Sequence, residues 1–151
     1  MLAFRIGSVK HAGIRQAAYS GHGSLHGDGR WHHRGRPAVY ASSHQSLALL
    51  ELLIHLDRKN QIRPHVGWVI DVPDEALLDP SDLPADWMTN IDATRSYGDA
   101  WLASRSSVCL RVPSIIVPAE LNVVINPAHP DFDLAWVIRG PERIEIDHRF
   151  V

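Results

Sequence analysis

The chain has 151 residues, of which 45% are hydrophobic and 21% are charged, a balance typical of one globular domain. The formal net charge of −2 argues against duplex nucleic acid as the main partner, because DNA-binding domains are usually strongly basic. No apolar stretch approaches the ~18 residues that a membrane span needs, and a single cysteine excludes an internal disulfide. We therefore expect a cytoplasmic protein with one domain over residues 1–151, which contacts neither DNA nor a membrane directly.

The N-terminal part predicts two strands and two helical segments around a polar loop. Strands are expected over Leu2–Ile6 and Pro37–Ser42, and one or two helical turns over Ile14–Tyr19. Segment 21–36 is rich in Gly, His and Arg and has too few apolar residues to form an element. A helix is expected from His44 to Asp57, capped by Ser42 or Ser43 and followed by the basic residues Arg58 and Lys59.

The rest of the chain predicts one more helix among several short strands. The helix is expected over Asp92–Ser104, with Ala93, Tyr97, Ala100, Trp101 and Leu102 as packing positions. Strands are expected over Val66–Val72, Val108–Val112, Ile115–Val117, Asn122–Ile125, Leu134–Ile138 and Arg143–Ile146, with a surface loop at Pro73–Pro84 and a turn at Gly140-Pro141. These short strands, interrupted by two convincing helices, favour an α+β fold with a mixed or antiparallel sheet.

Glu51 is the only acidic residue in the leucine-rich run 46–56. Helical spacing puts it beside Leu47, Leu50, Ile54 and His55, on the stripe that a helix would bury. A carboxylate on such a face needs a partner or suffers a large desolvation cost, and sequences carry that cost more readily when the group has a task. Glu51 is therefore the strongest single candidate for a functional residue.

Four other polar residues are ambiguous when each is considered alone. Arg30, flanked by a glycine and a tryptophan, suits either an anion clamp or a surface arginine stacked on the indole. Tyr40 on a strand is more often a core residue than a site residue. Ser114, between two apolar runs, suits a turn, and Asn122 suits either a turn or an amide beside a ligand.

The common metal, nucleotide and hydrolase motifs are missing. His22, His26, His32 and His33 share the polar loop, but no cysteine accompanies them and their spacing matches no common metal site, so we expect no metal. No glycine-rich phosphate fingerprint and no Gly-x-Ser-x-Gly elbow occurs. Cys109 lies in the apolar run 108–112, which favours a buried, inert thiol over a nucleophile.

The order of several short motifs is more informative than any one of them. They are Phe4-Arg5, Gly29-Arg30-Trp31, Val39-Tyr40-Ala41-Ser42, Leu49-Leu50-Glu51, Gly98-Asp99-Ala100-Trp101-Leu102, Val112-Pro113-Ser114-Ile115-Ile116-Val117-Pro118 and the run 122–130. Together they resemble the RES domain family, which is named after its Arg, Glu and Ser positions. The resemblance implies a fold similar to ADP-ribosyltransferase toxins. It also implies a toxin of a bacterial type II toxin–antitoxin system, paired with an Xre-like helix-turn-helix antitoxin that blocks the active site.

The resemblance also implies a substrate and a set of site residues. Members consume NAD⁺, some by phosphorolysis, and at least one subgroup modifies a protein instead. The family's arginine, tyrosine, glutamate and serine fall on Arg30, Tyr40, Glu51 and Ser114, and a further arginine matches Arg5. We expect these four residues to be catalytic, and Arg5, Arg30, Tyr40 and Asn122 to bind the substrate.

The chemistry of the bond supports these roles. Cleavage of the nicotinamide–ribose bond leaves an oxocarbenium-like sugar, which the Glu51 carboxylate would stabilise. Arg5 and Arg30 would neutralise the pyrophosphate, Tyr40 would stack on the nicotinamide ring or meet it edge-on, and Ser114 would donate to a phosphate or ribose oxygen. The acceptor (phosphate, water or a protein side chain), the formation of a homo-oligomer and the roles of the histidines in 21–36 stay open. An RNA-directed toxin that uses these histidines as acid and base is a third reading.

Overall fold

The computed structural model describes residues 1–56 and 63–150. Its strands are β1 (Leu2–Ser8), β2 (Val39–Ser42), β3 (His65–Asp71), β4 (Leu77–Leu78), β5 (Cys109–Pro113), β6 (Leu121–Ile125) and β7 (Val137–Ile144). Its α-helices are α1 (Val9–Ala12), α2 (Arg15–Ala18), α3 (Gln45–Leu53) and α5 (Ile91–Ser104), and its single 3-10 turns are η1 (His22–Leu25), η2 (Asp74–Ala76), η3 (Leu134–Trp136) and η4 (His148–Phe150). None of the helices in these ranges is long and apolar enough to cross a membrane.

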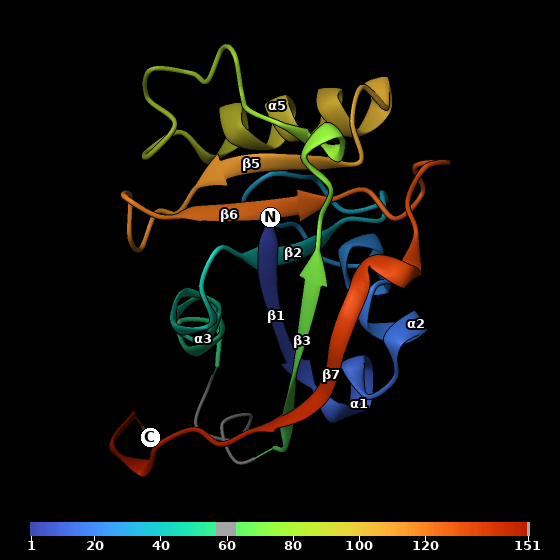
Figure 1. Ribbon diagram of the computed structural model, residues 1–151. Helices are drawn as coiled ribbons and strands as arrows, with labels where there is room; N and C mark the ends of the chain where they lie inside the picture. Colours follow the sequence, from blue (N-terminus) through green and yellow to red (C-terminus); the bar gives the residue numbers. More distant parts are fainter. Residues whose placement is uncertain (57–62, 151) are drawn as a thin grey trace.

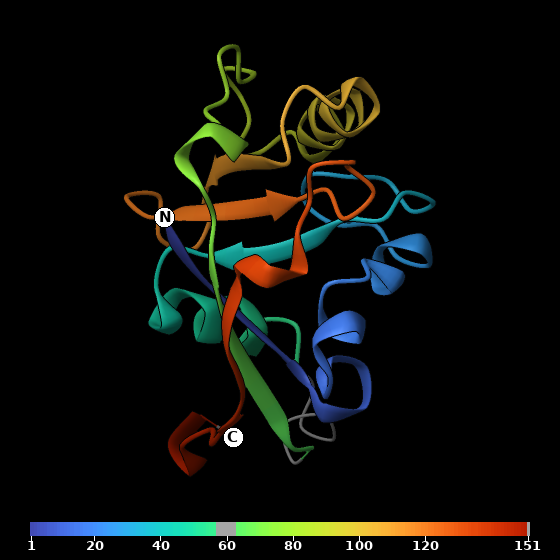
Figure 2. The same ribbon diagram turned by 45° about the vertical axis from the view of Figure 1, so that its right-hand side comes forward.

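The strands form one seven-stranded sheet in the order β4-β5-β6-β2-β1-β3-β7. Neighbouring strands are antiparallel except β4 and β5, which are parallel, so the expected α+β fold with a mixed sheet is confirmed. β1 pairs with β3 along its whole length, but with β2 through one residue pair, Phe4 and Ser42. Figures 1 and 2 show β5, β6 and β2 running crosswise to β1, β3 and β7. The sheet thus divides into two halves at the β1–β2 junction.

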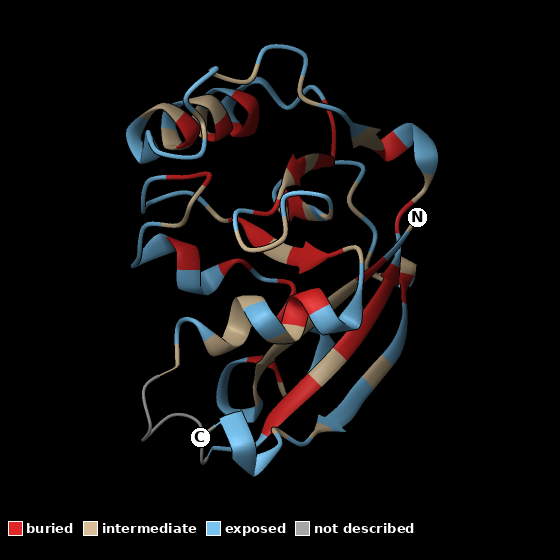
Figure 3. Cartoon of the chain, turned by 90° about the vertical axis from the view of Figure 1, so that its left-hand side faces the viewer, coloured by how far each residue is buried: buried red, intermediate tan, exposed pale blue. Residues whose placement is uncertain are grey.

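Alternating side chains of the strands build a core on each face of the sheet. On β6, Val123 and Ile125 join the cluster that includes residues of α1 and α2, whereas Val124 joins the cluster that includes Trp101 and Leu102 of α5. Figure 3 shows the buried residues concentrated in the strands and on the inner sides of the helices. α3 lies beside β1 and β2, next to the junction of the two halves (Figure 1). The two halves of the sheet and α3 therefore meet at one place.

Most of the expected elements are present, with ends shifted by one or a few residues. The predictions for the segments 115–117, 134–146 and 73–84 are wrong. Ile115–Val117 forms a bend instead of a strand, because the Ser114 hydroxyl accepts hydrogen bonds from the backbone N–H groups of Ile116 and Val117. The two strands expected at 134–138 and 143–146 are replaced by η3 and the single strand β7, which continues through Gly140-Pro141. The expected surface loop Pro73–Pro84 contains the short strand β4.

The helices also differ from expectation in detail. α3 begins after His44 without a side-chain cap, so the expected serine cap is wrong. The helix ends at Leu53, and the expected end at Asp57 with Arg58 and Lys59 lies outside the described residues. α5 begins after Asn90, whose side chain accepts a hydrogen bond from the backbone N–H of Ala93. Trp101 and Leu102 are buried as expected, but Ala100 is exposed, and Thr94 and Gly98 are buried instead.

Candidate active site

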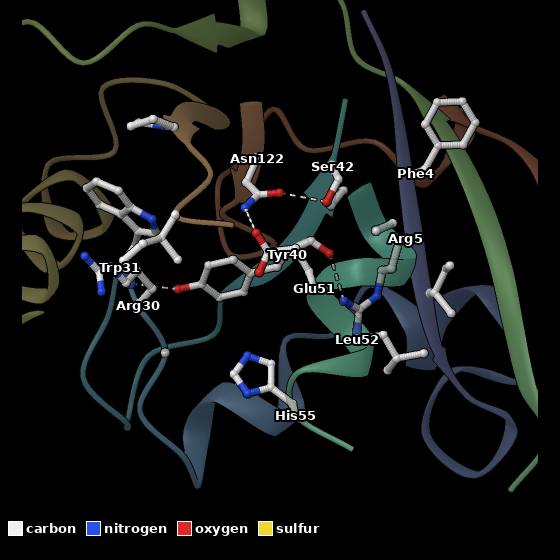
Figure 4. A pocket seen from close by; sticks show the side chains of 16 residues that line it. Phe4, Arg5, Arg30, Trp31, Tyr40, Ser42, Glu51, Leu52, His55 and Asn122 are labelled. Carbon is white, nitrogen blue, oxygen red and sulfur yellow. Dashed lines mark hydrogen bonds between the residues drawn. The ribbon is translucent and has the colours of Figure 1, made fainter. Parts of the chain in front are cut away.

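A cavity of about 290 Å³ opens beside the junction of the two sheet halves (Figure 4). Its walls come from β1, the loop before β2, β2, α3, the end of β5 and the start of β6, and include Phe4, Arg5, Arg30, Trp31, Tyr40, Ser42, Glu51, Leu52, His55 and Asn122. Five of the six residues expected from the sequence line this cavity, and the sixth, Ser114, is bonded to Glu51. Residues from distant parts of the sequence are thus brought together.

One side of α3 faces the cavity. Ala48, Glu51 and Leu52 line it, and their spacing of three or four residues places them on the same side of the helix; His55, in the turn after the helix, lines the cavity as well. The stripe expected from the sequence is partly wrong, because Leu50 and Ile54 are 37% and 58% exposed. Glu51 is therefore half-buried at the cavity wall instead of enclosed in the core.

Hydrogen bonds from β6 and from the residue after β5 fix the Glu51 carboxylate. Its Oε1 accepts from the Ser114 hydroxyl at 2.9 Å and from Nδ2 of Asn122 at 2.6 Å. The Ser42 hydroxyl in turn donates to Oδ1 of Asn122 at 2.7 Å, which fixes the orientation of the amide (Figure 4). No described residue donates a hydrogen bond to Oε2. The carboxylate is thus held by one oxygen, and the other is left for a ligand.

Tyr40 is held at both of its ends. Its backbone carbonyl accepts from Nη1 of Arg5 at 3.0 Å, and its phenol oxygen accepts from the backbone N–H of Trp31 at 3.2 Å. Nδ1 of His32 lies 2.7 Å from the same phenol oxygen. Burial raises the pKa of Tyr40 above its usual value, so the phenol stays neutral. Tyr40 is therefore suited to be a fixed aromatic wall of the cavity.

The two arginines of the cavity differ in their contacts. Arg5 is partly buried, and burial lowers the pKa of its guanidinium, although the nearby Tyr19 acts in the opposite direction. Nη2 of Arg30 donates to the backbone carbonyls of Trp87 and Met88, which ties the cavity wall to the segment before α5. Within the described residues, Nε of each arginine is buried and has no hydrogen-bond partner. Each guanidinium thus brings a positive charge to the cavity wall.

Helix α5 holds the segment that carries Arg30. The Thr94 hydroxyl donates to the carbonyl of Arg30 at 2.8 Å, Nε of Arg95 donates to the carbonyl of Gly29 at 2.8 Å, and the Asp99 carboxylate accepts from the backbone N–H and Nδ1 of His33 at 3.0 and 2.7 Å. A Cβ on Gly98 would lie 1.8 Å from the carbonyl oxygen of Trp31. The glycine lets the helix approach the loop, and this accounts for the Gly-Asp pair of the sequence motif.

A second, wider cavity of about 1000 Å³ adjoins the first and shares Arg5, Gly29 and Tyr40 with it. Its other lining residues include Lys10, His11, His22, His26 and His32, and Asp28 is the only acidic residue among the described side chains that line it. The second cavity is therefore suited to an anionic group.

Two residues that the structure connects to the site do not stand out in the sequence. Ser42 orients Asn122, and His32 contacts Tyr40. Ser42 is the last residue of the Val39–Ser42 motif, whereas nothing in the sequence separated His32 from the other histidines of its loop. No group of three or more His, Cys, Asp or Glu residues that could hold a metal ion occurs in the described ranges 1–56 and 63–150.

Comparison with known proteins agrees with this arrangement. The family model of the RES domain matches residues 2–147, so the chain belongs to the RES domain family. It is 38% identical over 136 residues to "Toxin Res" of Photorhabdus laumondii, covering 87% of this chain and 85% of that protein. It is 37% identical over 137 residues to "Toxin Res" of Yersinia enterocolitica, covering 88% and 90%. It is also 41% identical over 120 residues to the "Prs ADP-ribosylating toxin" of a Sphingobium strain, covering 74% of each chain.

Proposed function

We propose that this protein is the toxin of a bacterial type II toxin–antitoxin pair and that it cleaves the nicotinamide–ribose bond of NAD⁺, with phosphate or water as acceptor. The arrangement of Glu51 carries the proposal: one carboxylate oxygen is held by Ser114 and Asn122, and the other has no donor among the described residues, in a cavity with two arginines and a tyrosine in its wall.

The bond to be broken explains why such a carboxylate is useful. Nicotinamide leaves as a neutral molecule, and positive charge develops on the ribose. A carboxylate that is already oriented stabilises that charge without reorganising during the reaction. Because the donors that hold Glu51 are neutral, they leave its negative charge available to the sugar. Tyr40, whose phenol is fixed, would pack against the nicotinamide ring.

The two cavities suggest how a dinucleotide lies. The nicotinamide riboside would occupy the smaller cavity, beside Glu51 and Tyr40. Its diphosphate would pass Arg5, which belongs to both cavities, and the rest of the molecule would extend into the basic second cavity. A phosphate acceptor would be attracted by the same positive charges.

The test uses the purified protein and NAD⁺, with and without phosphate. We expect nicotinamide release, with the sugar product phosphorylated when phosphate is the acceptor. Glu51→Gln, which keeps the size of the side chain, is the matched control. Unchanged NAD⁺ under both conditions, with a folded protein, would contradict the proposal.

Transfer of ADP-ribose to a protein is the second candidate, favoured by the name of the Sphingobium relative. The same cavity serves both reactions, because they differ only in the nucleophile that attacks the ribose. NAD⁺ labelled in its adenosine half, incubated with a bacterial lysate, distinguishes them. A labelled protein band supports transfer, and a labelled soluble product alone supports phosphorolysis or hydrolysis.

An Xre-like helix-turn-helix antitoxin is the proposed partner, acting in the cytoplasm. A cavity with cationic walls is readily blocked by an acidic side chain or a C-terminal carboxylate of a neighbouring protein. We expect the complex of the two proteins to consume NAD⁺ more slowly than the free toxin. Equal rates would contradict inhibition by occupation of the cavity.

A further inference from the structure

His32 is buried, with 3% of its surface exposed, and both of its ring nitrogens have partners. Nε2 lies 3.1 Å from the backbone carbonyl oxygen of Gly27, and Nδ1 lies 2.7 Å from the phenol oxygen of Tyr40. A carbonyl oxygen accepts hydrogen bonds only, so Nε2 must carry the hydrogen. In a neutral imidazole Nδ1 is then an acceptor, and the Tyr40 hydroxyl donates to it.

The neutral form of His32 is also the favoured one. Burial lowers the pKa of His32, with a smaller opposing effect from its hydrogen bond to Gly27. The Tyr40 oxygen accepts from the Trp31 N–H while its own hydrogen points to Nδ1 of His32. The phenol group is therefore fixed in one orientation, and its hydrogen is engaged in the bond to Nδ1 of His32.

Gly29 makes room for this contact. A Cβ at position 29 would lie 2.4 Å from Cε1 and 2.5 Å from Nδ1 of His32, and 2.6 Å from the Tyr40 oxygen. Any larger residue at this position would push the two rings apart. The loop conformation thus brings His32 and Tyr40 together independently of what the cavity binds.

We propose that His32 is a positioning residue: as a neutral acceptor at Nδ1 it fixes the Tyr40 hydroxyl, and thereby fixes the aromatic wall on which the nicotinamide ring packs. The nature of the ring that packs there rests on the proposed function. The arrangement of His32, Tyr40 and Gly29 is independent of the proposed function.

Two amide substitutions test the two hydrogen bonds of His32 separately, because each variant keeps only one of them. In His32→Asn the amide oxygen can take the place of Nδ1, so the acceptor for Tyr40 is kept. In His32→Gln the longer side chain can place its amide at the position of Nε2, so the contact with Gly27 is kept and the contact with Tyr40 is lost. We expect the Asn variant to keep a near-normal KM for NAD⁺, and the Gln variant to show a KM raised about tenfold, the usual effect of one lost hydrogen bond.

A second measurement is independent of any activity. Nitrogen NMR of the ligand-free wild-type protein should show His32 neutral, with the hydrogen on Nε2 and none on Nδ1. Hydrogen on Nδ1, or a charged ring at neutral pH, would overturn the proposal, as would a Gln variant that matches the Asn variant in KM. Failure of the wild-type protein to consume NAD⁺ would contradict the proposed function instead, and the NMR result would still decide the role of His32.

Discussion

Nδ2 of Asn122 donates to Oε1 of Glu51 at 2.6 Å, so an amide from the sheet, not a cation, orients the carboxylate at the cavity wall. Within the described residues Glu51 forms no ion pair. An arginine in place of the amide would orient the carboxylate equally well but would also neutralise it. A neutral donor keeps the charge that an oxocarbenium-like sugar needs.

Replacing Glu51 by Gln should abolish most of the activity without unfolding the protein. The Gln side-chain oxygen can still accept from Ser114 and Asn122, so the hydrogen bonds are kept while the charge is removed. We expect NAD⁺ consumption to fall by about 10²–10³-fold and the free energy of unfolding to change by less than about 1 kcal/mol. Turnover and thermal unfolding should be measured on the same sample. A stable and fully active variant would contradict the role of Glu51.

Replacing Asn122 by Ala should lower both stability and activity. The change removes one of the two donors to Glu51 and also the acceptor of the Ser42 hydroxyl. We expect a loss of about 1–3 kcal/mol in stability and about a tenfold lower kcat. Ser42→Ala is the comparison variant: it keeps the donor of Asn122 to Glu51 and loses only the hydrogen bond that fixes the amide, so we expect a smaller loss of kcat than in Asn122→Ala. An unchanged kcat in a folded Asn122→Ala variant would contradict orientation of Glu51 by Asn122.

Replacing Gly98 by Ala tests the contact between α5 and the loop before β2. At an exposed position inside a helix, a change from Gly to Ala would stabilise the protein by about 1 kcal/mol. Here the added Cβ would overlap the carbonyl oxygen of Trp31, so we expect a net destabilisation of about 1–3 kcal/mol and loss of activity as the segment with Arg30 moves. Ser96→Ala, at an exposed position of the same helix, should leave both unchanged or slightly raise stability.

The stability of the protein should fall as the solution becomes mildly acidic. Burial lowers the pKa of both His32 and His65 below the usual value of 6.5, so in that range the unfolded chain binds protons that the folded chain does not. This contribution is fully present above the unfolded pKa and is lost as the pH falls towards the folded pKa. The melting temperature should decrease between about pH 7.5 and about pH 5.5. The decrease should be smaller in His32→Asn, and an equal decrease would exclude a contribution of His32.

Cys109 should be inert in the folded protein. It is fully buried, and burial raises the pKa of its thiol to about 12, so the reactive thiolate is not formed at neutral pH. We expect a thiol reagent to modify the protein only after unfolding. Cys109→Ala should keep normal NAD⁺ consumption and lose about 1 kcal/mol of stability, the usual cost of a small cavity. Rapid modification of the folded protein would contradict this reading.

The fold class and the candidate site residues could be predicted because they depend on local motifs and on their order. The side of α3 that packs on the sheet could not be predicted. Leucines occupy positions 47, 49, 50, 52 and 53, so they surround the helix instead of marking one stripe. Only contact with the sheet decides that Leu47 is buried and that Glu51 borders the cavity.

Other differences have similar causes. The apolar run Ile115–Val117 has a high β propensity, but one serine hydroxyl satisfies two of its backbone N–H groups and favours a bend. His32 differs from the histidines around it only through its contacts with Gly27 and Tyr40, which the sequence does not place nearby. Local propensity is thus outweighed where side chains bind the backbone or where distant segments meet.

Ser42 takes part in two structural links at once. Its backbone forms the pair with Phe4 that joins the two halves of the sheet, and its hydroxyl begins the chain of hydrogen bonds that passes through Asn122 to Glu51. The residue that closes the sheet at its junction is thus also the one that orients the donor of the carboxylate. The position of Glu51 is therefore set by the way the two halves of the sheet meet, and not by its own helix alone.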